Sequence, residues 1–118
     1  MDDIASGYRD SILGLLELIA SSEEQRAFAG KIPYDDYASE FYCLWFDDAF
    51  HPDSDLAQRA FLPNELDTLR SFSVIWERED TVLGQTDRSI GELLANANWC
   101  SVVEAATQAM ARLKSRAT

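Results

Sequence analysis

Carboxylate and aromatic side chains, which together could bind a cation or a basic protein surface, are concentrated in residues 34–50 of this 118-residue chain. Of these seventeen residues, YDDYASEFYCLWFDDAF, seven are aromatic, five are acidic and none is Lys or Arg. From residue 32 to residue 58 the chain has seven acidic residues and no Lys or Arg. A surface that served solubility alone would more commonly mix the two signs, although solubility remains an alternative explanation. The composition therefore indicates a face that meets a basic partner.

The spacing within residues 34–50 predicts an amphipathic helix. Residues at i, i+3, i+4 and i+7 intervals share an apolar face, which holds Tyr34, Tyr37, Ala38, Phe41, Leu44 and Trp45. The opposite face holds Asp36, Glu40, Cys43 and Asp47. Asp48 falls among the apolar positions, so we expect either that the helix ends near it or that its carboxylate bonds to a buried donor.

A second acidic group follows Trp76, and together with the central stretch it supplies the residues that we expect to bind a partner. Aromatic side chains contribute strongly to binding when they are partly exposed at an interface. Tyr42 lies at the edge of the apolar arc, so it is the ring that we expect to be exposed. The predicted partner-binding residues are Asp35, Asp36, Glu40, Tyr42, Asp47, Asp48, Asp53, Asp55, Glu77, Glu79 and Asp80.

The residue types needed for catalysis are scarce. His51 is the only histidine, and no Ser or Cys stands in a recognisable nucleophile arrangement with it. The sequence has no P-loop, dinucleotide-binding or HExxH zinc motif. A magnesium site built from Asp35, Asp36, Asp47 and Asp48 is conceivable, because hard cations need only oxygen ligands. We nevertheless expect a binding protein rather than an enzyme, with no catalytic residue, no metal and no other cofactor.

The overall charge narrows the class of partner. Twenty-one acidic and ten basic residues give a net charge of −11 and a pI near 4.3. This charge repels nucleic acid and anionic membranes and favours cationic proteins. No signal-peptide pattern and no apolar run long enough for a membrane span are visible, which predicts a soluble, cytoplasmic protein. In that reducing compartment Cys43 and Cys100 are expected to be buried free thiols.

Periodicity and capping residues predict an all-α fold, a compact single-domain bundle of about six or seven helices over residues 1–118. The expected helices run from Asp2 or Asp3 through Ile19, from Ser21 to Gly30, over residues 34–50, over Leu56–Phe61, from Pro63 to Trp76, from Asp87 or Ser89 through Leu94, and from Asn96 or Asn98 through Leu113. Residues 71–76 (SFSVIW) alternate as a strand would, so a short β segment is the alternative there. The apolar stripe of the helix from Pro63 is expected to be Leu66, Leu69, Phe72 and Trp76, and that of the last helix Trp99, Val102, Val103, Ala106, Met110 and Leu113. A loop is expected over Glu79–Gln85.

Three segments, YRDSILGLLELIASSEEQRAF, YDDYASEFYCLWFDD and LLANANWCSVVEAATQAMARLK, make the chain resemble the small, acidic, all-helical immunity proteins of bacterial toxin systems. These include the immunity proteins of colicins and of contact-dependent growth inhibition. The resemblance implies that a monomer binds one cognate basic toxin, expected to be a nuclease, and covers its nucleic-acid-binding cleft. The alternative is an acidic adaptor, a nucleic-acid mimic or a chaperone for a basic protein.

Overall fold

A computed structural model describes residues 2–117, with side chains as far as Lys114. Within that range the chain forms seven α-helices and one π-helical segment, η1, and no strand. The elements are α1 (Asp3–Ala20), α2 (Ser22–Lys31), α3 (Tyr37–Tyr42), η1 (Cys43–Ala49), α4 (Asp55–Ala60), α5 (Pro63–Leu83), α6 (Ile90–Leu94) and α7 (Ala97–Ala117). The prediction of an all-α bundle is confirmed.

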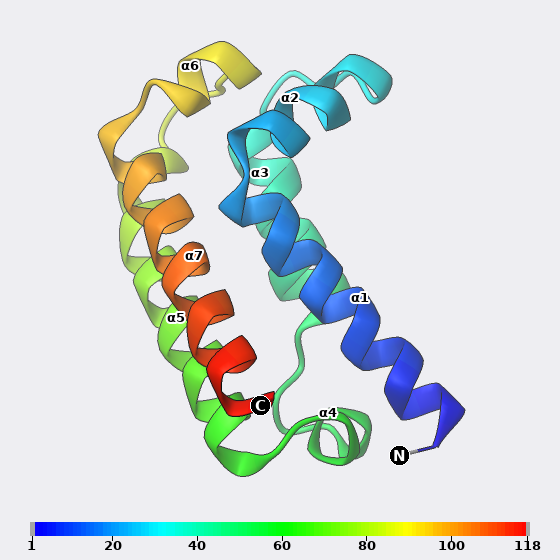
Figure 1. Ribbon diagram of the computed structural model, residues 1–118. Helices are drawn as coiled ribbons and strands as arrows, with labels where there is room; N and C mark the ends of the chain where they lie inside the picture. Colours follow the sequence, from blue (N-terminus) through cyan, green and yellow to red (C-terminus); the bar gives the residue numbers. More distant parts are fainter. Residues whose placement is uncertain (1, 118) are drawn as a thin grey trace.

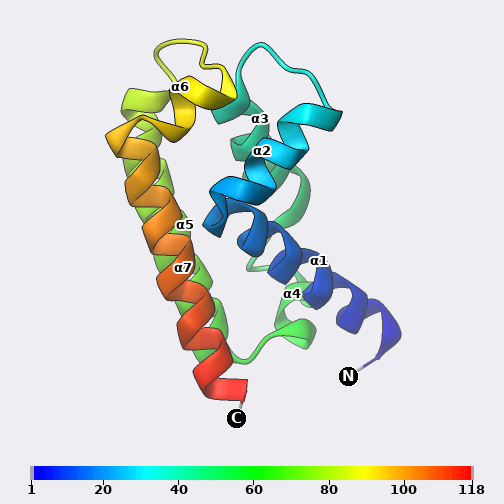
Figure 2. The same ribbon diagram turned by 45° about the horizontal axis from the view of Figure 1, so that its top comes forward.

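The two longest helices, α5 and α7, lie side by side and antiparallel, and α1 packs against α7 (Figures 1 and 2). The short helices α2 and α6 lie at the end where α5 finishes, and α4 lies at the opposite end beside α1 (Figure 1). Trp45 of η1, Trp76 of α5 and Trp99 of α7 are fully buried. The ring of Trp76 lies 6.4 Å from that of Trp45 and 5.7 Å from that of Trp99. These rings fix η1 on the α5–α7 pair.

Side-chain caps begin several helices where the sequence predicted them. Asp2 accepts a hydrogen bond from the Ala5 N–H at 2.8 Å, and Ser21 accepts one from the Glu24 N–H at 3.1 Å. Ser89 and Glu92 bond to each other's backbone N–H groups. Such bonds satisfy the N–H groups that have no partner inside the first turn of a helix.

The predicted helix over residues 34–50 is wrong at its start and in its type. Asp36 is the N-cap residue of α3, so the helix begins three residues later than expected. The Tyr37 hydroxyl donates to the Ile32 carbonyl at 2.8 Å and accepts from the Tyr34 N–H at 3.1 Å, which holds the preceding residues as a loop. From Cys43 the chain is π-helical.

The π-helical turn explains the position of Asp48. The Phe50 N–H donates to the Trp45 carbonyl at 2.7 Å, a bond between residues five apart. This wider turn lets the rings of Trp45 and Phe50 stack with their centroids 5.0 Å apart in the core. It also turns Asp48 toward solvent. The helix ends at Ala49, one residue after Asp48, which is one of the two outcomes that the sequence led us to expect.

Helix α5 replaces both the β segment and the loop that the sequence suggested. Phe72 and Trp76 are four residues apart, share a helical face and are buried, so no strand forms at residues 71–76. Residues 79–83, expected as a loop, belong to α5. The helix ends at Leu83 and is followed by the C-cap residue Gly84, whose N–H donates to the Asp80 carbonyl at 2.8 Å. Asn98 of α7 supports this last turn by donating to the Glu79 carboxylate at 2.7 Å.

The last helix follows the predicted stripe but exposes one thiol. Trp99, Val102 and Ala106 are buried on one face of α7. Cys100 follows Trp99, so it points to solvent, and the prediction of a buried thiol is wrong for it. Cys43 is half-buried. Both cysteines are free thiols, as predicted.

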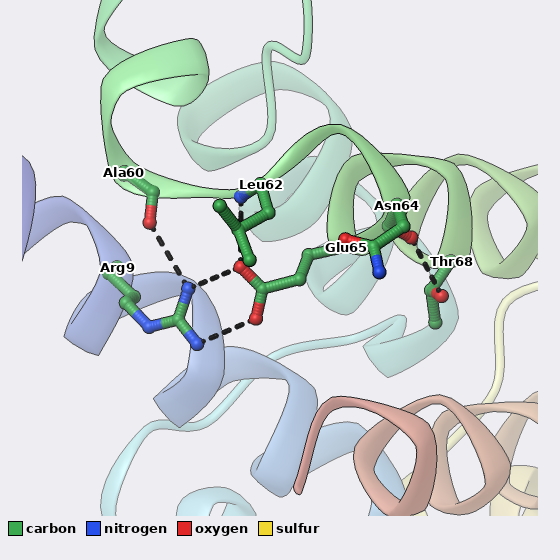
Figure 3. A network of polar contacts seen from close by, with 6 residues as sticks. All are labelled: Arg9, Ala60, Leu62, Asn64, Glu65 and Thr68. Atoms are coloured by element: carbon green, nitrogen blue, oxygen red, sulfur yellow. Dashed lines mark hydrogen bonds and ion pairs between the residues drawn. The ribbon is translucent and has the colours of Figure 1, made fainter. Parts of the chain in front are cut away.

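An ion pair between Arg9 and Glu65 joins α1 to the start of α5 (Figure 3). Both terminal nitrogens of Arg9 donate to the carboxylate of Glu65 at 2.9 Å. One of them also donates to the Ala60 carbonyl at 3.1 Å, and the guanidinium lies 4.9 Å from the centre of the Phe61 ring. Glu65 in turn accepts from the Leu62 N–H at 2.9 Å, which caps α5. The contacts of Arg9 and Glu65 therefore hold the connection between α4 and α5 against α1.

A second polar contact, inside the core, joins α1, α2 and α7. Gln25 of α2 is fully buried. Its amide nitrogen donates to the carbonyls of Leu18 and Ile19 at 3.1 and 3.0 Å, near the end of α1. Its amide oxygen accepts from the Trp99 indole at 2.9 Å. Trp99 stacks on Phe41 with centroids 5.7 Å apart, so this contact also positions α3.

Candidate protein-binding face

Tyr42 lies near carboxylates of η1 and of the second half of α5. Burial raises the pKa of the Tyr42 hydroxyl, and three negative charges nearby raise it further. Those charges are Glu77, Asp80 and Asp47. Burial also raises the pKa of Asp80, with further contributions from the charges of Asp36 and Glu77. We call Asp36, Asp47, Glu77 and Asp80 the acidic cluster.

The acidic cluster has no internal counter-ion within the part of the chain whose side chains are described. Six ion pairs occur there, and none of them includes a member of the cluster. The charges of Asp36 and Glu77 repel the ionised form of Asp80, which raises the free energy of the folded chain. A basic group that docks on this face would relieve that repulsion.

One member of the cluster has a structural task as well. The Asp36 carboxylate accepts from the Ala38 N–H and from the Arg88 N–H, both at 3.2 Å. The Tyr37 N–H donates to the Arg88 carbonyl at 3.0 Å, so the loop before α6 is attached to the start of α3. A substitution at Asp36 would therefore disturb the fold as well as the charge. Asp47 and Glu77 are exposed and suit charge reversal better.

The aromatic side chains beneath the cluster form a continuous layer. Tyr42 stacks on Phe46 with centroids 4.3 Å apart, and both rings meet the buried Trp76 edge-on, at 6.3 and 5.4 Å. Tyr42 is half-buried as a result, and the more exposed ring is Tyr34, at 48%. The prediction of an exposed Tyr42 therefore holds only in part.

The remaining predicted partner-binding residues lie outside the cluster or are already bonded. Asp53 pairs with Arg70 at 3.0 Å, and Asp55 pairs with Arg59 at 2.9 Å, so these two acids are neutralised. Glu79 accepts from Asn98, as described above. Asp35 and Asp48 are exposed, and Glu40 is half-buried near Cys43.

The chemistry available to Cys43 and His51 is limited by their surroundings. Burial raises the pKa of the Cys43 thiol, and its hydrogen bond to Asp47 raises it further. A thiol with a raised pKa is a poor nucleophile at neutral pH. The exposed His51 has a loop role, because its carbonyl accepts from the Ser54 hydroxyl at 2.7 Å and its N–H donates to the Tyr8 hydroxyl at 3.3 Å.

The carboxylates are spread rather than convergent. No three His, Cys, Asp or Glu side chains among the described residues are close enough together to hold a metal ion. The magnesium site considered for Asp35, Asp36, Asp47 and Asp48 is therefore not formed. A spread of separate negative charges suits a surface with several cationic side chains better than it suits one small ion.

An apolar groove borders the acidic cluster, and sequence reasoning did not find it. It is lined by Phe46, Phe50 and Pro52 and, from α5, by Ser73 and Val74. Arg70 and Glu77 also line the groove, and because they are the first and last of its residues along α5, they mark its two ends. The volume of the groove is about 290 Å³. The signal in the sequence was Val74, an apolar residue outside the Leu66–Leu69–Phe72–Trp76 stripe, but the groove also needs Phe46 of the distant π-helical segment.

Comparison of the chain with known protein families, with curated proteins and with solved structures finds no match. Among the described residues, no helix is both long enough and apolar enough to cross a membrane.

Proposed function

We propose that this chain is a protein-binding inhibitor of the immunity type, which holds one basic protein partner on the acidic cluster. The observation that carries the proposal is a group of four carboxylates without an internal counter-ion, set on a layer of aromatic rings. Carboxylates in this arrangement attract a basic surface, and the half-buried rings supply apolar contact once the surfaces meet. The partner's own basic cleft would be covered in the complex.

The kind of partner follows from the same charges. A basic toxin domain, such as a nuclease, has a cationic cleft that binds phosphates. A face of fixed carboxylates competes for that cleft and accelerates encounter by about 10- to 1,000-fold at low salt. Binding of this kind needs no catalytic group in the inhibitor, in keeping with the raised pKa of Cys43 and the loop role of His51.

The test is capture of partners from a lysate of the source cell at low salt, followed by stepwise elution with salt and mass spectrometry. One bait is the natural chain, and another carries Asp47→Lys and Glu77→Lys in the acidic cluster. A matched control carries Asp53→Lys and Asp55→Lys, which changes the net charge equally at residues that already have arginine partners.

We expect one basic protein, retained near one-to-one by the natural chain and by the control, and lost from the cluster variant. Several basic proteins with the same dependence on the cluster would favour the adaptor or chaperone alternative. Equal capture by all three baits would contradict the proposal, because the acidic cluster would then be irrelevant to binding.

A further inference from the structure

The apolar groove beside the acidic cluster is large enough to receive a side chain. Its volume of about 290 Å³ lies at the lower limit for a small-molecule site, which is roughly 300 Å³. One of its lining residues is Val74, whose side chain lies in the second half of α5 and is 66% exposed. A groove lined by this side chain together with aromatic and proline side chains is suited to an apolar group from a partner.

The groove and the acidic cluster share residues. Glu77 belongs to the cluster and also closes one end of the groove. Phe46 lines the groove and stacks on Tyr42, the ring that lies near three members of the cluster. The two features therefore form one continuous surface, apolar along α5 at Val74 and negative one turn further on.

The two ends of the groove differ in charge. Arg70, at one end, is ion-paired with Asp53 at 3.0 Å and lies 3.6 Å from Asp67, so its charge is compensated. Glu77, at the other end, has no ion pair among the side chains that the structure describes. It belongs to the acidic cluster with Asp80 and Asp47, so this end of the groove is negative. Charge complementarity thus requires an occupant with its cation at the Glu77 end and its apolar group toward Arg70.

We propose that this groove receives an aliphatic or aromatic side chain from a basic segment of the protein partner, while a lysine or arginine of that segment reaches Glu77. The inference rests on the proposed function and specifies the segment that the partner must present. Val74 and Glu77 are three residues apart, about 4.5 Å along the helix. In an extended chain, residues two positions apart lie on the same side and about 6.6 Å apart. The expected pattern is an apolar residue two positions before or after a basic one.

Two synthetic peptides labelled with fluorescein test the proposal by fluorescence anisotropy. Both are short, extended and lysine-rich, and one has a leucine two positions from a lysine where the other has serine. We expect the leucine peptide to bind the natural chain at least about tenfold more tightly. Burial of a leucine side chain contributes more free energy than the roughly 1.4 kcal/mol that corresponds to a tenfold change in affinity.

Two variants then locate the effect. Val74→Ser is expected to remove the difference between the two peptides and to leave binding of the serine peptide unchanged. Ile4→Ser is the matched control, because Ile4 is 69% exposed on α1, and it should keep the full difference. Both residues are exposed, so neither change should affect folding.

The outcomes separate this inference from the proposed function. Equal binding of the two peptides, or a difference that survives Val74→Ser, would overturn the groove while leaving the acidic cluster intact. Loss of serine-peptide binding on Asp47→Lys with Glu77→Lys would support the cluster independently. Failure of both peptides to bind would overturn the two proposals together.

Discussion

Replacement of Gln25 by leucine tests how the core holds α3, which carries part of the acidic cluster. Leucine is similar in size to glutamine but has no amide, so the change removes three hydrogen bonds without leaving a large cavity. The Trp99 indole N–H would lose its acceptor at 2.9 Å, and the Ile19 carbonyl would lose its donor at 3.0 Å. The Leu18 carbonyl would lose less, because it also accepts from the Ser21 N–H.

The magnitude follows from burial. A buried polar group left without a partner costs about 1–3 kcal/mol, and two such groups are created. Part of that cost is offset because leucine is more apolar than glutamine. We therefore expect the free energy of unfolding to fall by about 2–4 kcal/mol, which corresponds to roughly 10 °C in melting temperature for a chain of this size.

Urea denaturation followed by circular dichroism gives the free energy, and the indole proton of Trp99 in an NMR spectrum reports the lost bond. Gln58→Leu is the matched control, because Gln58 is exposed on α4 and its replacement should change stability by no more than about 0.5 kcal/mol. If Gln25→Leu unfolds at the same urea concentration as the natural chain, the buried amide does not stabilise the fold and this reasoning is refuted.

Two further changes test other contacts. Arg9→Met is expected to lower the free energy of unfolding by about 3 kcal/mol in urea denaturation, because the Glu65 carboxylate stays buried after its cation is removed. The double variant Arg9→Met with Glu65→Met should recover most of that loss, and losses that simply add would contradict the explanation. The pKa of Asp80 is raised, so ionising it costs stability: the penalty is absent below the ordinary aspartate pKa, develops as the pH rises through the raised value and remains at neutral pH. Asp80→Asn should therefore stabilise the chain by a few tenths of a kcal/mol at pH 7, with no gain near pH 3 in thermal melts, whereas a gain equal at both pH values would rule out the carboxylate charge as the cause.

Local signals predicted most of the helices. The hydroxyls of Ser21 and Ser89 each cap a helix by accepting a hydrogen bond from the backbone N–H three residues later. Both partners therefore lie within one short stretch of sequence. The stripe of α7 repeats over several turns, and its burial follows from that repetition alone. The register of Trp99 was correct for this reason.

The π-helical segment could not be predicted in the same way. Its defining bond, from the Phe50 N–H to the Trp45 carbonyl, accompanies the packing of the Trp45 ring against α5, where the centre of the Phe72 ring lies 5.3 Å from that of Trp45. That contact joins residues 27 positions apart, which no local period reveals. Gln25 was missed similarly, because its acceptor role depends on Trp99, 74 residues away.

The sequence showed that the candidate site would be rich in carboxylates, but not which carboxylates would form it. The excess of carboxylates over residues 32–58 is visible in the sequence, and so is the acidic group after Trp76. Which carboxylates keep a free charge depends on where arginines lie in space. Asp53 is neutralised by Arg70, 17 residues away, whereas Asp36 and Asp80 come together from α3 and α5 without a cation. Only the fold separates the two groups.

The central claim is that the acidic cluster, and not the overall negative charge, binds a basic protein. Stopped-flow association of the captured, purified partner tests it most directly, with the natural chain, the Asp47→Lys and Glu77→Lys variant, and the Asp53→Lys and Asp55→Lys control, each at low and high salt. We expect the association rate of the natural chain and the control to fall at least about tenfold as salt rises, and the cluster variant to associate slowly at both concentrations. Equal rates for the two double variants would contradict the claim, because position would then matter less than net charge.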